Sequence, residues 1–427
     1  MTTINTVQSL MQKYIRNPSK GPKIVLFTGG SGVRSPAIEL AKYTHRTRHI
    51  INTTDSGGST GMLRQVFELP GKHEFPAIGD IRSRLFDLAN HEIPGYREVA
   101  KLLHYRLPKY ADNNILRRVL SHIIRGNHEL IRAIRKNSNN ENLDTSSIPT
   151  SIIIQNALKT FWDTASTFER NYSLTLDLSG ASIGNLFLAG LYFQYGGTGE
   201  ALQTAIYFYK QLADVKGEVI PAHLESLHLA ARFKDKTLYG QHLITQNSLS
   251  LPVDELWYIN DLENKKKVVP TVNPDVIKAI QEADMIVYGM GSFETSLRSI
   301  LIIPGIAEAI RRRNVPKVLI TNPVLDEETI RMTAINCACK IGNTLQDMDT
   351  DQSYDYNNYL TYVLANEYPG ATMFKSKYGN RFGYMPIGEG VIGNGVKLLQ
   401  NNLLTSQGAK TYDPALLVEL LFSIMAK

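Results

Sequence analysis

A strand, a glycine-rich loop, a helix and a second strand follow one another near the N-terminus, and this order constrains the fold most. Residues 23–27 (Lys-Ile-Val-Leu-Phe) form a continuous apolar run, typical of a strand buried on both faces of a parallel sheet. The pattern predicts a helix at Ser35–Lys42 and a second strand at His49–Thr54. Together these segments predict a βαβ unit, whose crossover is almost always right-handed.

The same alternation returns in the second half of the chain. A helix at Pro274–Glu282 precedes a strand at Ala283–Tyr288, a second glycine loop and a helix at Gly305–Arg313. Another strand is predicted at Lys317–Thr321. We therefore predict a Rossmann-like three-layer α/β/α fold with a mostly parallel sheet.

The domain organisation follows from where this alternation is interrupted. Residues 1–20 read as an N-terminal helix and linker, and residues 21–427 as one α/β domain. Within that domain, residues 94–168 are helical and basic, and we interpret them as an insertion with a polar loop at Asn137–Ser147. A helix at Ile183–Phe193 is apolar nearly all round, which predicts that it is buried.

Positive charge is concentrated in the insertion. The net charge is +6, and residues 97–136 hold ten Lys and Arg against three Asp and Glu. Such a segment can bind nucleic acid or another polyanion. Apolar residues recur there at helical spacing, as in Leu116, Val119, Leu120 and Ile123. We therefore interpret the charges as the solvated face of helices and expect no nucleic-acid partner.

Composition places the chain among ordinary globular proteins, with 427 residues, 43% hydrophobic and 20% charged. No stretch approaches the roughly 18 apolar residues of a membrane helix, so we expect no membrane partner. Two cysteines, Cys337 and Cys339, exclude a disulfide framework. The polar N-terminus has no signal-peptide pattern, and a cytoplasmic location is expected.

Polar or glycine-rich clusters directly follow four of the predicted strands. In an open α/β sheet the carboxyl ends of the strands form the ligand crevice, and glycines let backbone N–H groups approach a phosphate. We predict that the crevice binds a nucleotide diphosphate. A tight turn that needs glycine only for its geometry is the alternative for the first cluster. The predicted binding residues of the loops are Gly29, Gly30, Ser31, Gly32, Gly57, Gly58, Ser59, Gly289, Gly291 and Ser292.

Two aspartates are candidate ligands for Mg²⁺. Asp55 follows the second strand and Asp80 lies just before an amphipathic helix. Two carboxylates together with phosphate oxygens suit Mg²⁺, which prefers few protein ligands and retains water. The alternatives are an N-cap or Asx-turn for Asp55 and an N-cap for Asp80. Arg82 is the predicted phosphate-neutralising residue, with Arg64 second.

At these motifs the sequence resembles the CofD/YvcK family. That family includes 2-phospho-L-lactate transferases of deazaflavin coenzyme synthesis and the YvcK-type gluconeogenesis factors. The resemblance runs from about Gly21 to Asp326 in the family's order. It is carried by residues 29–32, 54–64, 79–85, 182–191, 283–296 and 303–310.

The resemblance implies a Rossmann-like fold that binds a nucleotide diphosphate. In the transferase branch, carboxylates at the positions of Asp55 and Asp80 hold Mg²⁺. A phospho-acyl group passes from a guanosine diphosphate-linked donor to an acceptor hydroxyl, and GMP leaves. In the YvcK branch, the same loops hold UDP-sugars or a nicotinamide nucleotide, and the role is regulatory. Family members are often dimeric, so a homodimer is expected by analogy.

Two departures from the family pattern bear on function. Ser56 stands where many relatives have a second aspartate, and Met290 replaces a common proline. The leading hypothesis is a Mg²⁺-dependent transferase in which Asp55, Asp80 and Arg82 act at the metal and phosphate. Asn185, Thr295 and Asn322 complete the predicted nucleotide-binding set. The alternative is a regulator that binds a UDP-sugar or NADP without turnover.

Overall fold

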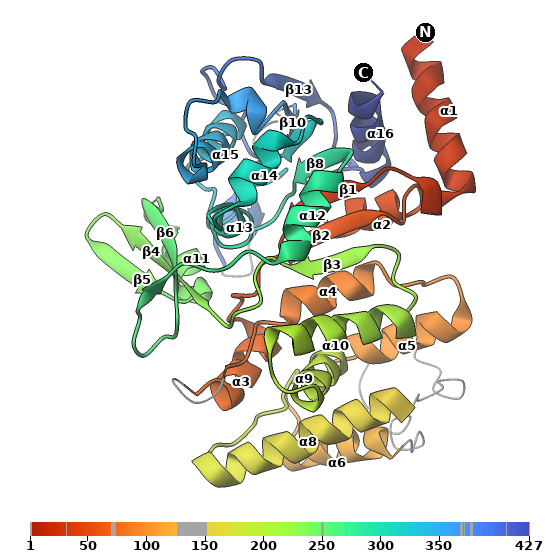
Figure 1. The fold of residues 1–427 in the computed structure, drawn as a ribbon, viewed down its shortest axis with the longest axis vertical. Helices are drawn as coiled ribbons and strands as arrows, with labels where there is room; N and C mark the ends of the chain where they lie inside the picture. The colour runs from red at the N-terminus through yellow and green to blue at the C-terminus, as the bar shows by residue number, and fades with distance from the viewer. Residues whose placement is uncertain are drawn as a thin grey trace. The chain divides into compact units, whose positions relative to one another are not determined.

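The computed structural model divides into two compact units (Figure 1). Unit 1 comprises Met1–Asn52, Gly217–His223 and Leu227–Lys427, and unit 2 comprises Thr53–Lys216 and Leu224–Ser226. The structure describes residues 2–30, 32–69, 74–125, 152–248, 252–367, 370, 372–375, 379–406 and 408–426.

Unit 1 is built on a seven-stranded sheet whose pairings are all parallel. The strand order is β13-β10-β9-β8-β1-β2-β3. The strands are β1 (Ile24–Thr28), β2 (Thr47–Ile51), β3 (Glu218–Pro221), β8 (Met285–Tyr288), β9 (Lys317–Ile320), β10 (Tyr362–Asn366) and β13 (Lys397–Asn401).

Helices cover both faces of this sheet, because its central strands are apolar on both sides. In β1, Ile24 and Leu26 pack on one face, with residues of α1 (Thr2–Arg16), α2 (Arg34–Ala41) and α16 (Pro414–Met425). Val25 and Phe27 pack on the other face, with residues of α12 (Pro274–Glu282), α14 (Ile306–Arg312) and α15 (Ala334–Met348). The alternation of side chains along a strand thus produces two apolar layers and a three-layer α/β/α fold.

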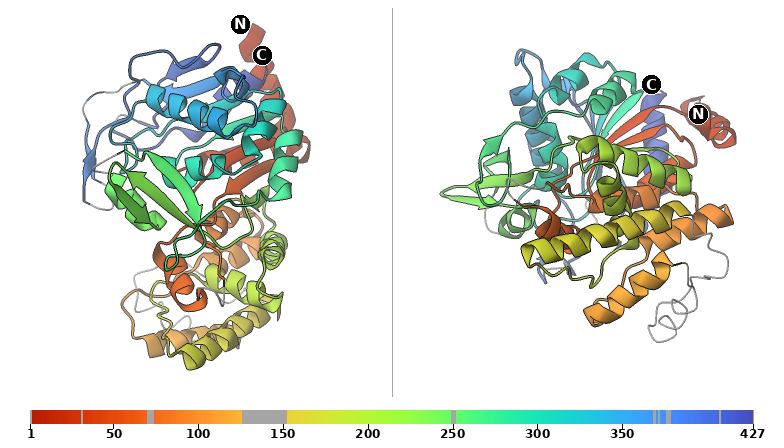
Figure 2. Two further views of the ribbon diagram at one scale, coloured as in Figure 1. Left: turned by 60° about the vertical axis from the view of Figure 1, so that its left-hand side comes forward. Right: turned by 60° about the horizontal axis from the view of Figure 1, so that its bottom comes forward.

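The helices of unit 1 and two small antiparallel sheets complete this unit (Figure 2). The helices are α1 (Thr2–Arg16), η1 (Pro18–Lys20), α2 (Arg34–Ala41), α11 (Gln241–Ser248), α12 (Pro274–Glu282), η3 (Phe293–Arg298), α13 (Ser299–Leu301), α14 (Ile306–Arg312), α15 (Ala334–Met348), η4 (Tyr356–Asn358) and α16 (Pro414–Met425). One small sheet holds β4 (His228–Phe233), β5 (Lys236–Tyr239), β6 (Glu255–Ile259) and β7 (Lys267–Val268), and the other β11 (Phe374–Lys375) and β12 (Arg381–Phe382).

Unit 2 is helical and lies in the connection between β2 and β3. Its helices are α3 (Gly58–Phe67), α4 (Gly79–Asp87), α5 (Pro94–His104), α6 (Asn113–Ile124), α8 (Ile152–Tyr172), α9 (Ile183–Gln194) and α10 (Gly199–Leu212). Helix α9 contacts α4, α5, α8 and α10. Its residues 183–192 are all buried, which confirms the prediction from its uniformly apolar sequence.

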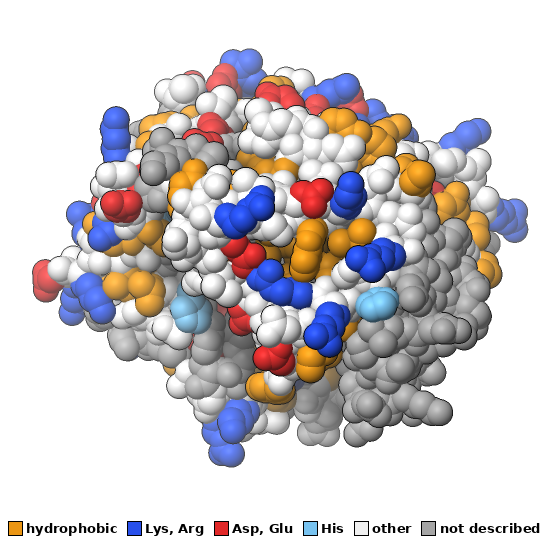
Figure 3. All heavy atoms as spheres, turned by 90° about the horizontal axis from the view of Figure 1, so that it is seen from below, with side chains coloured by type: hydrophobic (Ala, Val, Ile, Leu, Met, Phe, Trp, Pro, Cys, Tyr) orange, Lys and Arg blue, Asp and Glu red, His pale blue; other side chains and the backbone are white. Residues whose placement is uncertain are grey.

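The face of unit 2 that carries α6 and α8 is seen in Figure 3. Lys and Arg side chains surround exposed apolar atoms there, with Asp and Glu side chains among them. In α6 the apolar residues Leu116, Val119, Leu120 and Ile123 are buried, as their spacing predicts. The polar stretch Asn137–Ser147 of the predicted insertion lies outside the described residues. None of the helices in the described part of the chain has the length and apolar character needed to span a membrane.

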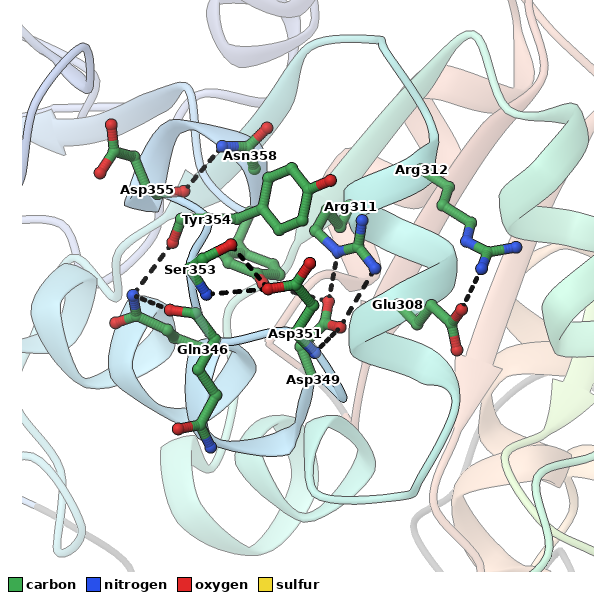
Figure 4. A network of polar contacts seen from close by, with 12 residues as sticks. Glu308, Arg311, Arg312, Gln346, Asp349, Asp351, Ser353, Tyr354, Asp355 and Asn358 are labelled. Atoms are coloured by element: carbon green, nitrogen blue, oxygen red, sulfur yellow. Dashed lines mark hydrogen bonds and ion pairs between the residues drawn. The ribbon is translucent and has the colours of Figure 1, made fainter.

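A network of polar contacts joins α14 to the segment after α15 (Figure 4). Asp349 accepts hydrogen bonds from the Nε of Arg311 at 2.8 Å and from the hydroxyl of Tyr359 at 3.0 Å. The side chain of Asp349 is 0% exposed. The Arg311 guanidinium also lies 4.1 Å from the centroid of the Tyr354 ring. These contacts fix the helix that leads into β9 against the segment that leads into β10.

Candidate functional site

The loops that follow β1 and β8 lie at a switch point of the sheet. From β1 the chain proceeds to β2 and β3 on one side, whereas β8, β9, β10 and β13 occupy the other side. β1 and β8 are parallel neighbours, so their carboxyl ends point to the same edge. Ligands of open α/β sheets bind outside such a point, where the connections diverge.

The backbones of these two loops approach so closely that only glycine fits. A Cβ atom on Gly32 would lie 2.7 Å from the backbone nitrogen of Gly291. A Cβ atom on Gly29 would lie 2.2 Å from the side chain of Ser296. Gly291 itself has φ of +140°, a conformation that other residues rarely adopt. The loops after β1 and β8 therefore form one backbone-lined surface within unit 1.

Asn322, at the end of β9, holds the β8 loop in place. Its Oδ1 accepts the backbone N–H of Gly291 at 3.0 Å, and its Nδ2 donates to the carbonyl of the same residue at 3.0 Å. The Nδ2 also donates to Asp326 Oδ2 at 3.2 Å. The Asn322 amide thus stabilises the conformation of the β8 loop at Gly291. A small pocket beside it is lined by Gly289, Gly291, Thr321, Asn322, Cys337 and Met385.

Thr295 is fully buried and is bound to Glu328, a residue that the sequence patterns did not single out. The Thr295 hydroxyl donates to Glu328 Oε1 at 2.7 Å, and the backbone N–H groups of Glu294 and Thr295 donate to Oε2. Thr245 donates a further bond to Oε1 at 2.7 Å. Burial, and then the charge of Asp326, raise the pKa of Glu328 to about 7.

Asp326 is partly buried, and its charge acts on Glu328. Burial raises its pKa to about 6, although Thr329 and backbone N–H groups donate hydrogen bonds to its carboxylate. Asp326 and Glu328 follow the end of β9, and acidic residues after a parallel strand are a signal that could have identified them.

In unit 2, Asp55 lies close to Gly79, the residue that precedes the second predicted metal-binding aspartate, Asp80. Asp55 Oδ1 accepts the backbone N–H of Gly57 at 3.0 Å, which is the Asx-turn weighed as its alternative. A Cβ atom on Gly79, the residue next to Asp80, would lie 3.3 Å from Asp55 Oδ2. Asp80 lies in the first turn of α4, whose N-cap position is occupied by Ile78.

Arg82 is buried beside these aspartates, with 3% of its surface exposed. Its Nη1 lies 2.9 Å from His104 Nδ1, and its Nε has no hydrogen-bond partner among the described residues. Burial lowers the pKa of Arg82, and the charge of Arg106 lowers it further. Arg64, the second candidate, is paired with Glu68 through bonds of 2.6 and 2.9 Å.

Ser59 and Asn185 meet in the same part of unit 2. The Asn185 Nδ2 donates to Ser59 Oγ at 2.7 Å, and both residues are buried. Gly58 begins α3 with φ of +52°. Of the remaining predicted residues, Ser292 precedes η3 and Ser31 lies outside the described residues.

The structure therefore places the predicted residues in two sets. One set belongs to unit 1 and comprises Gly29, Gly30, Gly32, Gly289, Gly291, Ser292, Thr295 and Asn322. The other belongs to unit 2 and comprises Asp55, Gly57, Gly58, Ser59, Asp80, Arg82 and Asn185. Across the described residues, no group of three or more His, Cys, Asp and Glu side chains is arranged to hold a metal ion.

Comparison with known families gives a match that covers most of the chain. The family model described as "2-phospho-L-lactate transferase CofD" matches residues 24–386. A protein of Aquifex aeolicus described as "Putative gluconeogenesis factor" is 27% identical over 322 residues, which is 74% of this chain and 72% of that protein.

A protein of Nostoc with the same description is 27% identical over 303 residues. This alignment covers 71% of the chain but 47% of the Nostoc protein. The chain thus spans about half the length of some of the relatives it matches.

Solved structures extend the comparison to the fold. A Bacillus halodurans protein of the UPF0052 family superposes with a TM-score of 0.62 and 21% identity. The superposition covers 93% of this chain and 98% of that protein. This likeness supports the three-layer α/β architecture.

Proposed function

Because the chain belongs to the CofD family, we propose that it is a Mg²⁺-dependent transferase that acts on a nucleotide diphosphate-linked donor. The group transferred would be a phospho-acyl group, the acceptor a hydroxyl, and the product released a nucleoside monophosphate. The observation that carries the proposal is the contact of the β1 and β8 loops at the switch point of the sheet. There a Cβ atom on Gly32 would lie 2.7 Å from the backbone of Gly291.

The nucleotide would bind to these loops through their backbone. A pyrophosphate needs N–H donors without side chains in the way, and glycine provides this. Asn322 supports such a surface, because its amide is bonded to both the N–H and the carbonyl of Gly291. The loop geometry is then fixed before a ligand arrives, which reduces the entropy cost of binding.

The residues of unit 2 fit a Mg²⁺ ion. Asp55 Oδ2 lies close to the start of α4, because Gly79 has no Cβ atom. Asp80 is the next residue of that helix. Two carboxylates suit a cation that keeps several waters and binds substrate phosphates. Asp55 and Asp80 would hold the ion, which would neutralise phosphate oxygens. Arg82 would balance charge on the transferred phosphoryl group, since phosphoryl transfer depends chiefly on positioning and electrostatics.

Replacing Asp55 tests the metal role. Asp55→Asn keeps the acceptor of the Asx-turn but removes the charge, so Mg²⁺-dependent release of nucleoside monophosphate should fall by about 100-fold or more. Asp163→Asn on α8 is the matched control, because that side chain is exposed and lies in the same unit. Retention of full turnover in Asp55→Asn would contradict the metal role of this residue.

A regulator without turnover is the second candidate. It is favoured by the name that the Aquifex and Nostoc relatives carry and by Ser56, which replaces a possible acidic ligand. Calorimetry with GDP, GTP, UDP-N-acetylglucosamine and NADPH, with and without Mg²⁺, separates the two. The transferase predicts tight guanine nucleotide binding that requires Mg²⁺. Tight binding of a UDP-sugar or NADPH that is independent of Mg²⁺ would favour the regulator.

A further inference from the structure

Arg106 of unit 2 belongs to the basic segment 97–136, whose charges we interpreted from the sequence as the solvated face of helices. It lies two residues after the end of α5, and it is exposed. Its Nη1 donates to the carbonyl of Gly180 at 3.1 Å and lies 3.5 Å from Ser59 Oγ. Within the part of the chain that the structure describes, Arg106 has no carboxylate partner. Its charge is therefore left for solvent or for a ligand.

Arg82 lies in the same part of unit 2 as Ser59. A Cβ atom on Gly184 would lie 2.9 Å from Arg82 Cγ, and the next residue, Asn185, is bonded to Ser59. Two guanidinium groups at one site repel each other unless an anion binds to them. The Nε of Arg82, buried and without a partner among the described residues, is a donor in need of an acceptor.

Ser59 is oriented to donate a hydrogen bond to such an anion. A hydroxyl has one proton and two acceptor positions. The Ser59 oxygen accepts from Asn185 Nδ2 at 2.7 Å and faces Arg106 Nη1 at 3.5 Å. With donors on both acceptor positions, the hydroxyl proton has to point to another acceptor. The backbone N–H groups at the start of α3 lie beside it and also favour negative charge.

We propose that Arg82, Arg106 and Ser59 form a binding site for a terminal phosphate group. About two negative charges are needed to neutralise two guanidinium groups. A phosphate monoester carries about two, whereas a carboxylate carries one. The inference deepens the proposed function and rests on it only for the origin of the phosphate. A nucleotide or a phosphorylated acid can carry it, and GMP and phosphoenolpyruvate distinguish these sources.

The test is a calorimetric titration of the full chain with inorganic phosphate at constant ionic strength. Arg106→Gln should weaken phosphate binding about tenfold or more, the value of a lost charge-assisted contact. Arg118→Gln on α6 removes the same charge from another exposed arginine of unit 2 and should leave the affinity unchanged. Arg106→Lys keeps the charge but loses the planar donor fork, and should lie between them.

The outcomes separate this inference from the proposed function. Unchanged phosphate affinity in Arg106→Gln, or equal losses in Arg106→Gln and Arg118→Gln, would overturn the site. Wild-type protein that binds no phosphate would overturn it as well. Loss of phosphate binding in Arg106→Gln alone, in a protein that binds no nucleotide diphosphate, would support the site and contradict the proposed function.

Discussion

At the scale of single residues, the buried carboxylate of Glu328 links loop structure to pH. It accepts the N–H groups of Glu294 and Thr295 and the hydroxyls of Thr245 and Thr295. Four donors favour the charged form, yet burial and the neighbouring Asp326 raise the pKa of Glu328 to about 7. The residue thus takes up a proton on folding at mildly acidic pH.

This proton uptake predicts that stability falls as pH rises. The pKa of Glu328 is about 7 in the folded chain, whereas its ordinary value, 4.5, applies to the unfolded chain. Between these pH values the folded state therefore binds more protons than the unfolded state. The free energy of unfolding is therefore highest below pH 4.5 for this group and decreases towards pH 7. One proton corresponds to a slope of about 1.4 kcal/mol per pH unit. Asp326, with a pKa of about 6, contributes in the same direction.

Glu328→Gln tests this prediction by urea unfolding at several pH values. The glutamine oxygen can accept both N–H groups, and its NH₂ can donate to the threonine hydroxyls, so the loop should be kept. The variant should show a flatter dependence of stability on pH than the wild type. Glu389→Gln, at an exposed residue, is the control and should keep the wild-type slope. An unchanged slope in Glu328→Gln would refute the assignment.

At the scale of elements, the ion pair between α14 and the end of α15 should contribute strongly to stability. Arg311→Ala leaves the carboxylate of Asp349, whose side chain is 0% exposed, without its cation. Breaking such a pair from one side costs about 3 kcal/mol. Arg312→Ala is the matched control, because its partner Glu308 lies on the same helix and both side chains are accessible (Figure 4). Equal free energies of unfolding in the two variants would show that the Asp349 network contributes little to stability.

Strands with an apolar sequence at the centre of the sheet were predictable, and the polar edge strand β13 was not. The predictions for β1, β8 and β9 are confirmed within a few residues, and the helix Pro274–Glu282 is confirmed at both ends. These strands are buried on both faces, so local sequence alone identifies them. β13 lies at the sheet edge with a partly exposed polar sequence and gives no such signal.

The candidate site shows the same division. The glycine loops were identified because their chemistry is local in sequence. The contacts that support them were not, because they join residues far apart in the chain. Asn322 bonds to Gly291, which is 31 residues away, and Glu328 to Thr295, which is 33 residues away. No periodic pattern encodes such a pairing. Arg106 was overlooked because a surrounding run of basic residues has a simpler explanation as a solvated face.

At the scale of the whole molecule, the chain combines a parallel sheet with a helical unit inserted between two adjacent strands. Unit 1 contains the glycine loops after β1 and β8, and unit 2 contains Gly57, Gly58, two candidate aspartates and two candidate arginines. The functional proposal requires the first set to bind a nucleotide. This requirement is more basic than the metal role or the phosphate site, because it is common to the transferase and to the regulator.

Nucleotide affinity of Gly32→Ala therefore tests the central claim most directly. The new Cβ atom would lie 2.7 Å from backbone atoms of Met290 and Gly291, which cannot yield without moving the loop. Gly95→Ala is the control, because a Cβ atom there meets nothing within 4 Å. Calorimetry with GDP and UDP-N-acetylglucosamine should show wild-type affinity in Gly95→Ala. The affinity of Gly32→Ala should be about tenfold weaker or worse. Undiminished nucleotide binding by a folded Gly32→Ala protein would contradict the account.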